Sequence, residues 1–266
     1  MQIKKRIFSG VVCEQEVYFV HSPFRKNPSV KREPRIRFKN EAERERHRTE
    51  ISRRRHTRLF NENFTPASLY STLTLDDANE VYSFEEMKKL RDLYIRRLRR
   101  AYPDAVIFAY IGKGKTTQRF HMHMVTNGIP EEAIIGKWTF GRIFRVEHLR
   151  ENCRYKHADG QMYDHGADYS GLANYLFDHW TPEQGGHRYK ATRNARKPEE
   201  EEPVECKRWY SLEHPPVAPK GYELVDARST DYGFYLYKYV RKERKAETVL
   251  RTPCRCVKFS DKRRLL

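Results

Sequence analysis

Long apolar runs are absent from this 266-residue sequence. No stretch approaches the ~18 apolar residues that a membrane span needs. The first ten residues, MQIKKRIFSG, also lack the apolar region of a signal peptide. We therefore expect a soluble, cytoplasmic protein that has no membrane partner.

Cysteine is scarce, and an odd number cannot pair completely within one chain. The sequence has one C-x-C pair with no second pair to match it, which argues against a structural zinc site. The five residues are Cys13, Cys153, Cys206, Cys254 and Cys256. We expect them to be reduced thiols, as in a cytoplasm.

Acidic residues are fewer than basic ones, so the formal net charge is +17. Residues 31–60 hold 12 Lys/Arg against 5 Asp/Glu, and residues 241–266 hold 10 against 3. Such an excess favours polyanions because their counterions are released on binding. Nucleic acid is therefore the expected partner, with a ribosomal or membrane-surface role as the alternative.

The polar and apolar pattern predicts an α+β fold, in which helices pack on one side of an antiparallel sheet. A basic helix precedes this unit and a C-terminal extension follows it. Apolar runs at 7–12 and 17–20 indicate a hairpin or an edge-strand pair. Helices are expected at 38–60, after a capping box of Ser83 and Glu86, at 129–137 and at 167–180. Strands are expected at LYSTLTLDD, AVIFAYI, RFHMHMVT, 138–146 and YGFYLYKYV.

The sequence His121-Met122-His123 lies on one of these strands. Side chains alternate across a strand, so His121 and His123 face the same way while Phe120, Met122 and Met124 face the helices. Two adjacent imidazoles are ready metal ligands. A lone H-x-H is weak evidence by itself, because surface or packed histidines give the same pattern.

The predicted helix DYSGLANYLFDHW places Tyr175 and His179 four residues apart, on one face. A tyrosine nucleophile needs its phenol beside a cation that polarises the scissile phosphate. We expect Tyr175 to be the nucleophile, with Tyr169 as the alternative. His179 is the expected third metal ligand, and Asp178 and His165 are its alternatives.

These features resemble the three ordered motifs of HUH replication initiators: an L-T-L-T strand, an H-x-H strand and a tyrosine helix. NENFTPASLYSTLTL, KWTFGRIFRVEHL, HRYKATRNARKP and APKGYELV each resemble blocks of the group that phages and integrative elements of Gram-positive bacteria carry. The resemblance covers roughly residues 1–240. It implies an HUH endonuclease (RRM-like) fold that nicks one DNA strand at a single-stranded, sometimes hairpin, origin and stays attached to the 5′ phosphate.

The resemblance also implies Mg²⁺ or Mn²⁺ as cofactor, a bacterial host cytoplasm, and a host helicase and polymerase as partners. Two departures stand out. AYIGKGKTTQ has no acid to supply a ligand, and Asp178 occupies the position of the lysine in the common Tyr-x-x-Lys motif. A transposase of the same chemistry and a non-catalytic DNA-binding regulator on the same fold are therefore the alternatives.

The GKGKT run is no P-loop, because Ala109 stands where that motif needs glycine. The expected DNA contacts come from the first strand, the turn before H-x-H and the block HRYKATRNARK. They are Thr72, Thr74, Lys113, Lys115, Lys190, Arg193 and Asn194. The chain is expected to divide into a basic segment (1–64), the endonuclease domain (65–198), and an acidic linker with a small β extension and a basic tail (199–266).

Overall fold

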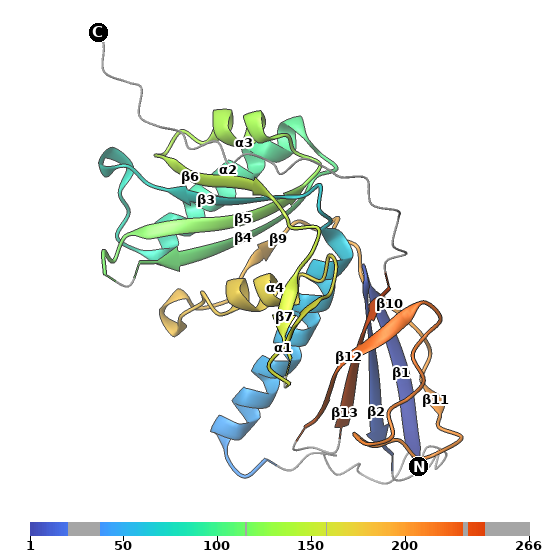
Figure 1. The fold of residues 1–266 in the computed structure, drawn as a ribbon. Coiled ribbons are helices and arrows are strands. Elements are labelled where there is room, and N and C mark those ends of the chain that lie inside the picture. The colour runs from blue at the N-terminus through green and yellow to red at the C-terminus, as the bar shows by residue number, and fades with distance from the viewer. Residues whose placement is uncertain (21–37, 115, 158, 231–233, 243–266) are drawn as a thin grey trace, which may run out of the picture.

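The computed structural model describes residues 1–20, 38–114, 116–157, 159–230 and 234–242 (Figure 1). These residues form an α+β fold with two larger antiparallel sheets, a small hairpin and four α-helices. The helices are α1 (Glu41–Asn63), α2 (Phe84–Ala101), α3 (Glu131–Lys137) and α4 (Ser170–Phe177). Among the described residues, no helix is both long and apolar enough to cross a membrane.

The first sheet, here called the central sheet, carries the H-x-H strand at its middle. Its order is β6 (Ile143–His148), β3 (Leu69–Thr74), β5 (Phe120–Asn127), β4 (Val106–Lys113) and β9 (Lys190–Ala191). The alternation predicted for β5 is confirmed, since Phe120, Met122 and Met124 pack in the core beneath α2 and α3. The opposite face, which carries the two histidines, contacts α1 and α4 through a second core.

Helices therefore cover both faces of the central sheet, and the expectation of helices on one side was wrong. The misleading element was α1, whose sequence is polar nearly all round. Its C-terminal half is nevertheless buried, because its polar groups find partners inside. His56 bonds the hydroxyl of Tyr110 at 2.7 Å, and Arg58 pairs with Glu14 and Glu16.

The second sheet, here called the terminal sheet, joins strands from both outer parts of the chain. Its order is β10 (Glu199–Glu200), β1 (Gln2–Ser9), β2 (Val12–Phe19), β13 (Phe234–Arg241) and β12 (Tyr222–Ser229), with β11 (Val204–Glu205) also paired to β1. The ranges 1–64 and 199–266 thus contribute to one sheet. The turn after β1 packs on α1, where a β-carbon on Gly10 (φ +60°) would lie 2.4 Å from the Asn61 carbonyl oxygen.

The acidic run at 199–205 is not a free linker, contrary to expectation. It forms β10 and β11 along β1, and its carboxylates meet the basic side chains of that strand. Glu200 pairs with Lys5, and Glu201 pairs with Arg6 at 3.6 Å. The predicted basic tail lies largely outside the described residues.

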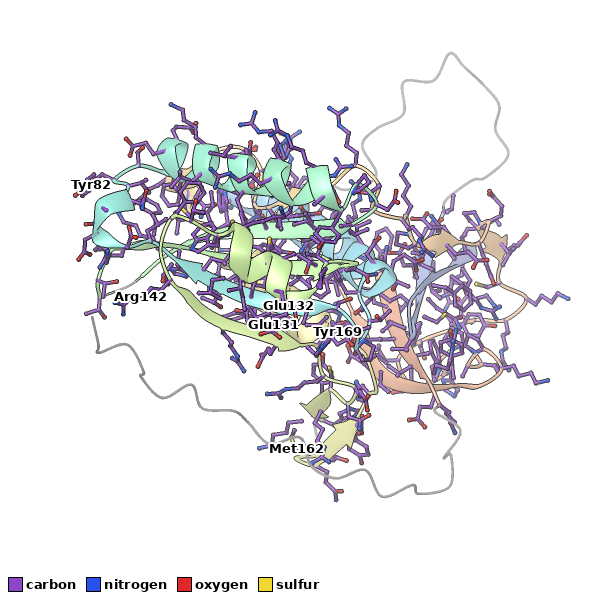
Figure 2. The ribbon with its side chains drawn as sticks, turned by 90° about the horizontal axis from the view of Figure 1, so that it is seen from above. Tyr82, Glu131, Glu132, Arg142, Met162 and Tyr169 are labelled. Carbon is purple, nitrogen blue, oxygen red and sulfur yellow. The ribbon has the colours of Figure 1, made fainter. Side chains whose placement is uncertain are left out.

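The tyrosine helix α4 is shorter than the predicted 167–180. Its start is anchored by Asp168, which is fully buried. Asp168 accepts hydrogen bonds from Ser170 on α4, Asn61 on α1 and Lys238 on β13. Just before the helix, β7 (Arg154–Lys156) and β8 (Met162–Asp164) form a hairpin, and Figure 2 shows Met162 on the part of it that projects from the body.

Candidate metal centre beside an exposed tyrosine

The two histidines of H-x-H lie side by side on β5. Their ring centroids are 4.9 Å apart, and β3 places Thr74 opposite His121 and Thr72 opposite His123. His123 is buried and His121 is half-buried. Both imidazoles therefore point from the middle of the sheet toward the face that α4 partly covers.

His179, just beyond α4, completes a group of three. One ligand atom of each of His121, His123 and His179 lies within 4.8 Å of the others. Nδ1 of His179 is 2.8 Å from the carbonyl oxygen of Tyr175. Because a carbonyl can only accept, Nδ1 carries the hydrogen and the lone pair is on Nε2.

His123 has a partner on one ring nitrogen only. Its Nδ1 is 2.7 Å from the hydroxyl of Tyr70 and 3.2 Å from that of Thr72. Its Nε2 is buried and has no hydrogen-bond partner among the described residues. An orphaned buried nitrogen calls for an unseen partner. A metal ion on Nε2, with Nδ1 donating its hydrogen to Tyr70, meets that need and matches the usual support of a histidine ligand.

The surroundings favour the neutral imidazole that metal binding requires. Burial, and then the neighbouring His179 and His121, lower the pKa of His123 to about 3. Burial also lowers the pKa of His121, with His179 as the next cause. The shift of each pKa therefore favours the unprotonated ring, most strongly for His123.

The three imidazoles fit a divalent metal ion, whose identity they do not fix. Imidazole suits Zn²⁺, Cu²⁺, Fe²⁺ and Ni²⁺, and Mg²⁺ prefers oxygen ligands. Mn²⁺ binds imidazole more readily than Mg²⁺ does.

Tyr175 stands next to this group with its side chain open to solvent. It is 53% exposed, and its ring centroid lies 4.4 Å from that of His179 and 6.2 Å from that of His123. Tyr169, the alternative nucleophile, is only 2% exposed, and its hydroxyl donates to the Arg150 carbonyl oxygen at 3.1 Å. Tyr175 is thus the accessible phenol of the two.

The two alternative third ligands are engaged elsewhere. Arg53 donates two hydrogen bonds, of 2.7 and 2.6 Å, to Asp178, and this contact lowers the pKa of the Asp178 carboxyl. His165 lies by the β7–β8 hairpin, with its Nε2 2.7 Å from Nε2 of His157. Of the three candidates, only His179 joins the H-x-H pair.

The expected DNA contacts separate into two groups. Thr72 and Thr74 lie on the histidine face, although the Thr74 hydroxyl donates to the Arg142 carbonyl oxygen at 2.9 Å. The others lie away from the histidines or are engaged with the protein. Lys113 sits over the Phe120 ring, Lys190 is 3.8 Å from Asp92 of α2, Arg193 lies beside α2, and Asn194 donates to the Asp104 carbonyl oxygen. Lys115 lies outside the described residues.

Two residues that support the site were missed in the sequence. Tyr70 lies two residues before Thr72 on β3, and its ring stacks on His123 with an interplanar angle of 14°. Gly112, on β4, pairs directly with His121. The period-two pattern of β3 was the available signal for Tyr70, since it places residues 70, 72 and 74 on the histidine face.

A search for related proteins found no match among family models, curated proteins or solved structures. The three-histidine group beside Tyr175 is therefore what the fold itself offers as a guide to function.

Proposed function

We propose that this chain is a metal-dependent tyrosine DNA endonuclease and strand transferase of HUH type, which starts rolling-circle replication by nicking one strand at an origin. One observation carries the proposal: an exposed tyrosine, Tyr175, adjoins three imidazoles that can share one metal ion. The central position of the H-x-H strand in a five-stranded antiparallel sheet supports an HUH-type, RRM-like fold.

In this reaction the Tyr175 oxygen attacks a phosphorus atom of the strand. The bond from phosphorus to the 3′ oxygen breaks, the 3′ hydroxyl leaves with a proton, and the 5′ phosphate remains on the tyrosine. A bound metal ion would polarise that phosphate. The protein's part is to orient the groups: His179 is fixed by the Tyr175 carbonyl, and His123 is fixed by Tyr70. A free 3′ hydroxyl can later attack the phosphorus atom of the phosphotyrosine link, which joins the strand to that hydroxyl and frees Tyr175.

The test is the covalent adduct itself. The protein is incubated with Mn²⁺ and a pool of random single-stranded DNA, and adducts that survive denaturation are counted and sequenced. We expect adducts for the natural chain and for Tyr169→Phe, and none for Tyr175→Phe, which removes only an exposed hydroxyl. Adduct formation by Tyr175→Phe would contradict the proposal. DNA binding without any adduct in the natural chain would instead favour a regulator.

A further inference from the structure

A groove of about 1200 Å³ lies between α1 and the terminal sheet, apart from the histidine group. Figure 1 shows α1 running beside this sheet and diverging from it. One wall is the α1 face that carries Arg46, Glu50 and Arg54, and the other includes Lys5 and Phe234. The chain at 189–200 contributes the rest of the lining.

Most carboxylates of this groove are already matched by cations. Glu16 pairs with Arg54 and Arg58, Glu200 pairs with Lys5, and Glu50 is 3.8 Å from both Arg53 and Arg228. The remaining acid, Glu43, accepts a hydrogen bond from the backbone N–H of Lys39 at the start of α1. These ion pairs neutralise most of the negative charge in the groove lining.

Four cations of the groove stay unmatched. They are Arg46, Arg55, Lys197 and Lys39, which are all exposed and have no ion pair with any described residue. They come from two stretches far apart in the sequence, the basic helix with the residues just before it and the end of the block HRYKATRNARK. The field of Arg55 reaches one of the nearby acids, since the pKa of Glu200 is lowered by Lys5 first, and then by Arg58 and Arg55. The groove therefore has an excess of positive charge at its surface.

Aromatic rings accompany these cations. Tyr189 lines one side of the groove and Phe234 lines the other. Unmatched cations with aromatic rings are what a single nucleic-acid strand uses, since phosphates meet the cations and bases stack on the rings. The core of a protein–protein interface is depleted of charged residues, whereas this lining is rich in them.

We propose that this groove is a second binding site, which holds the backbone of single-stranded DNA beyond the segment at Tyr175. The inference rests on the proposed function and extends it. Arg53 is the neighbour of Arg54, which lines the groove. It lies on the side of α1 that faces α4, where it donates a hydrogen bond to Asp178, the neighbour of His179. Arg188, over the rings of Phe177 and Trp180, lies next to Arg53 and extends the same cationic path.

The experiment compares two variants of the full chain that lose the same charge from the same helix. Arg46→Gln/Arg55→Gln removes two groove cations. Arg44→Gln/Arg48→Gln removes two exposed arginines outside the groove, both of which pair with Glu41. Binding of labelled oligothymidylate is measured by fluorescence anisotropy over a range of salt concentrations, with chelator present. This probe contains no origin, so its binding does not depend on cleavage.

The slope of log K against log salt is negative, and we expect it to be shallower by about 1.4 in the groove variant. The reason is that each phosphate contact on a single strand contributes about 0.7 to its magnitude. The control variant should keep the slope of the natural chain, and adding Lys197→Gln to the groove variant should make it shallower by about a further 0.7. Equal slopes for the groove and control variants would overturn the inference. If the natural chain forms no adduct but the groove variant still has the shallower slope, the inference about the groove holds and the proposed nicking reaction is rejected.

Discussion

Gly112 lies directly across from His121 in the central sheet, and a β-carbon built on Gly112 would sit 2.4 Å from Nε2 of His121. No real side chain tolerates that distance. The imidazole thus occupies space that only glycine leaves open. The position opposite His121 on β4 therefore has no side chain that could supply a ligand.

We expect Gly112→Ala to displace the His121 ring and weaken Mn²⁺ binding by about 10–100-fold, the range for changes that disturb the support of a ligand. Titration followed by electron paramagnetic resonance measures this without any assay of cleavage. Gly136→Ala is the matched control, because a β-carbon at Gly136 meets nothing within 4 Å. Natural affinity in Gly112→Ala would show that His121 is not a ligand.

The third ligand is tested by His179→Ala. Losing one of three imidazole ligands should raise the Mn²⁺ concentration for half-saturation by at least ~10–100-fold, which is the effect of changing a residue that only supports a ligand. Asp178→Ala should change it little, because Asp178 is bound by Arg53. The same Mn²⁺ titration measures both variants. An unchanged titration for His179→Ala, with loss for Asp178→Ala, would make Asp178 the ligand.

Acid should destabilise the fold through His56, which is 1% exposed. Burial, and then Arg53, lower its pKa to about 3, whereas an unfolded histidine has a pKa of ~6.5. Below pH 6.5 the unfolded chain therefore takes up a proton that the folded chain does not, and stability falls as the pH drops from 6.5 toward 3. At pH 5 the loss is at most about 2 kcal/mol.

Urea unfolding of His56→Phe at pH 7.5 and pH 5 checks this. The variant is less stable throughout, since the Tyr110 hydroxyl loses its partner, but the difference between the two pH values should shrink by up to about 2 kcal/mol. His187→Phe, at an exposed histidine, should keep the natural difference. An unaltered pH difference in His56→Phe would contradict the prediction.

Local sequence patterns predicted the features that depend on neighbouring residues, namely the faces of strands and helices and the start of a helix. Alternation along β5 placed His121 and His123 on one face, and helical spacing placed His179 beside Tyr175. The capping box of Ser83 and Glu86 begins α2 as expected. The α+β class followed from the order of these elements.

Long-range pairing was beyond such rules. The backbone N–H of Tyr210 donates to the side chain of Gln2, and Tyr18 pairs with Phe234, yet no periodicity signals either contact. Burial of α1 was hidden because polar pairs such as His56 with Tyr110 carry it. The prediction that Lys190 contacts DNA came from charge alone. In the structure Lys190 lies on β9, and its ammonium group is 3.8 Å from Asp92 of α2.

The pairing of β2 with β13 has a consequence for synthesis. Tyr18 leaves the ribosome 216 residues ahead of its partner Phe234, a delay of roughly 10–40 s at about 5–20 residues per second. For most of that interval both edges of the β1–β2 hairpin are unpaired, because β10 and β11, the partners of β1, are also made late, and unpaired edges are prone to pairing with neighbouring nascent chains. Lys238 arrives on the same late strand, so buried Asp168 gains its ammonium partner only then. The start of the tyrosine helix is therefore among the last parts of the described fold to be secured.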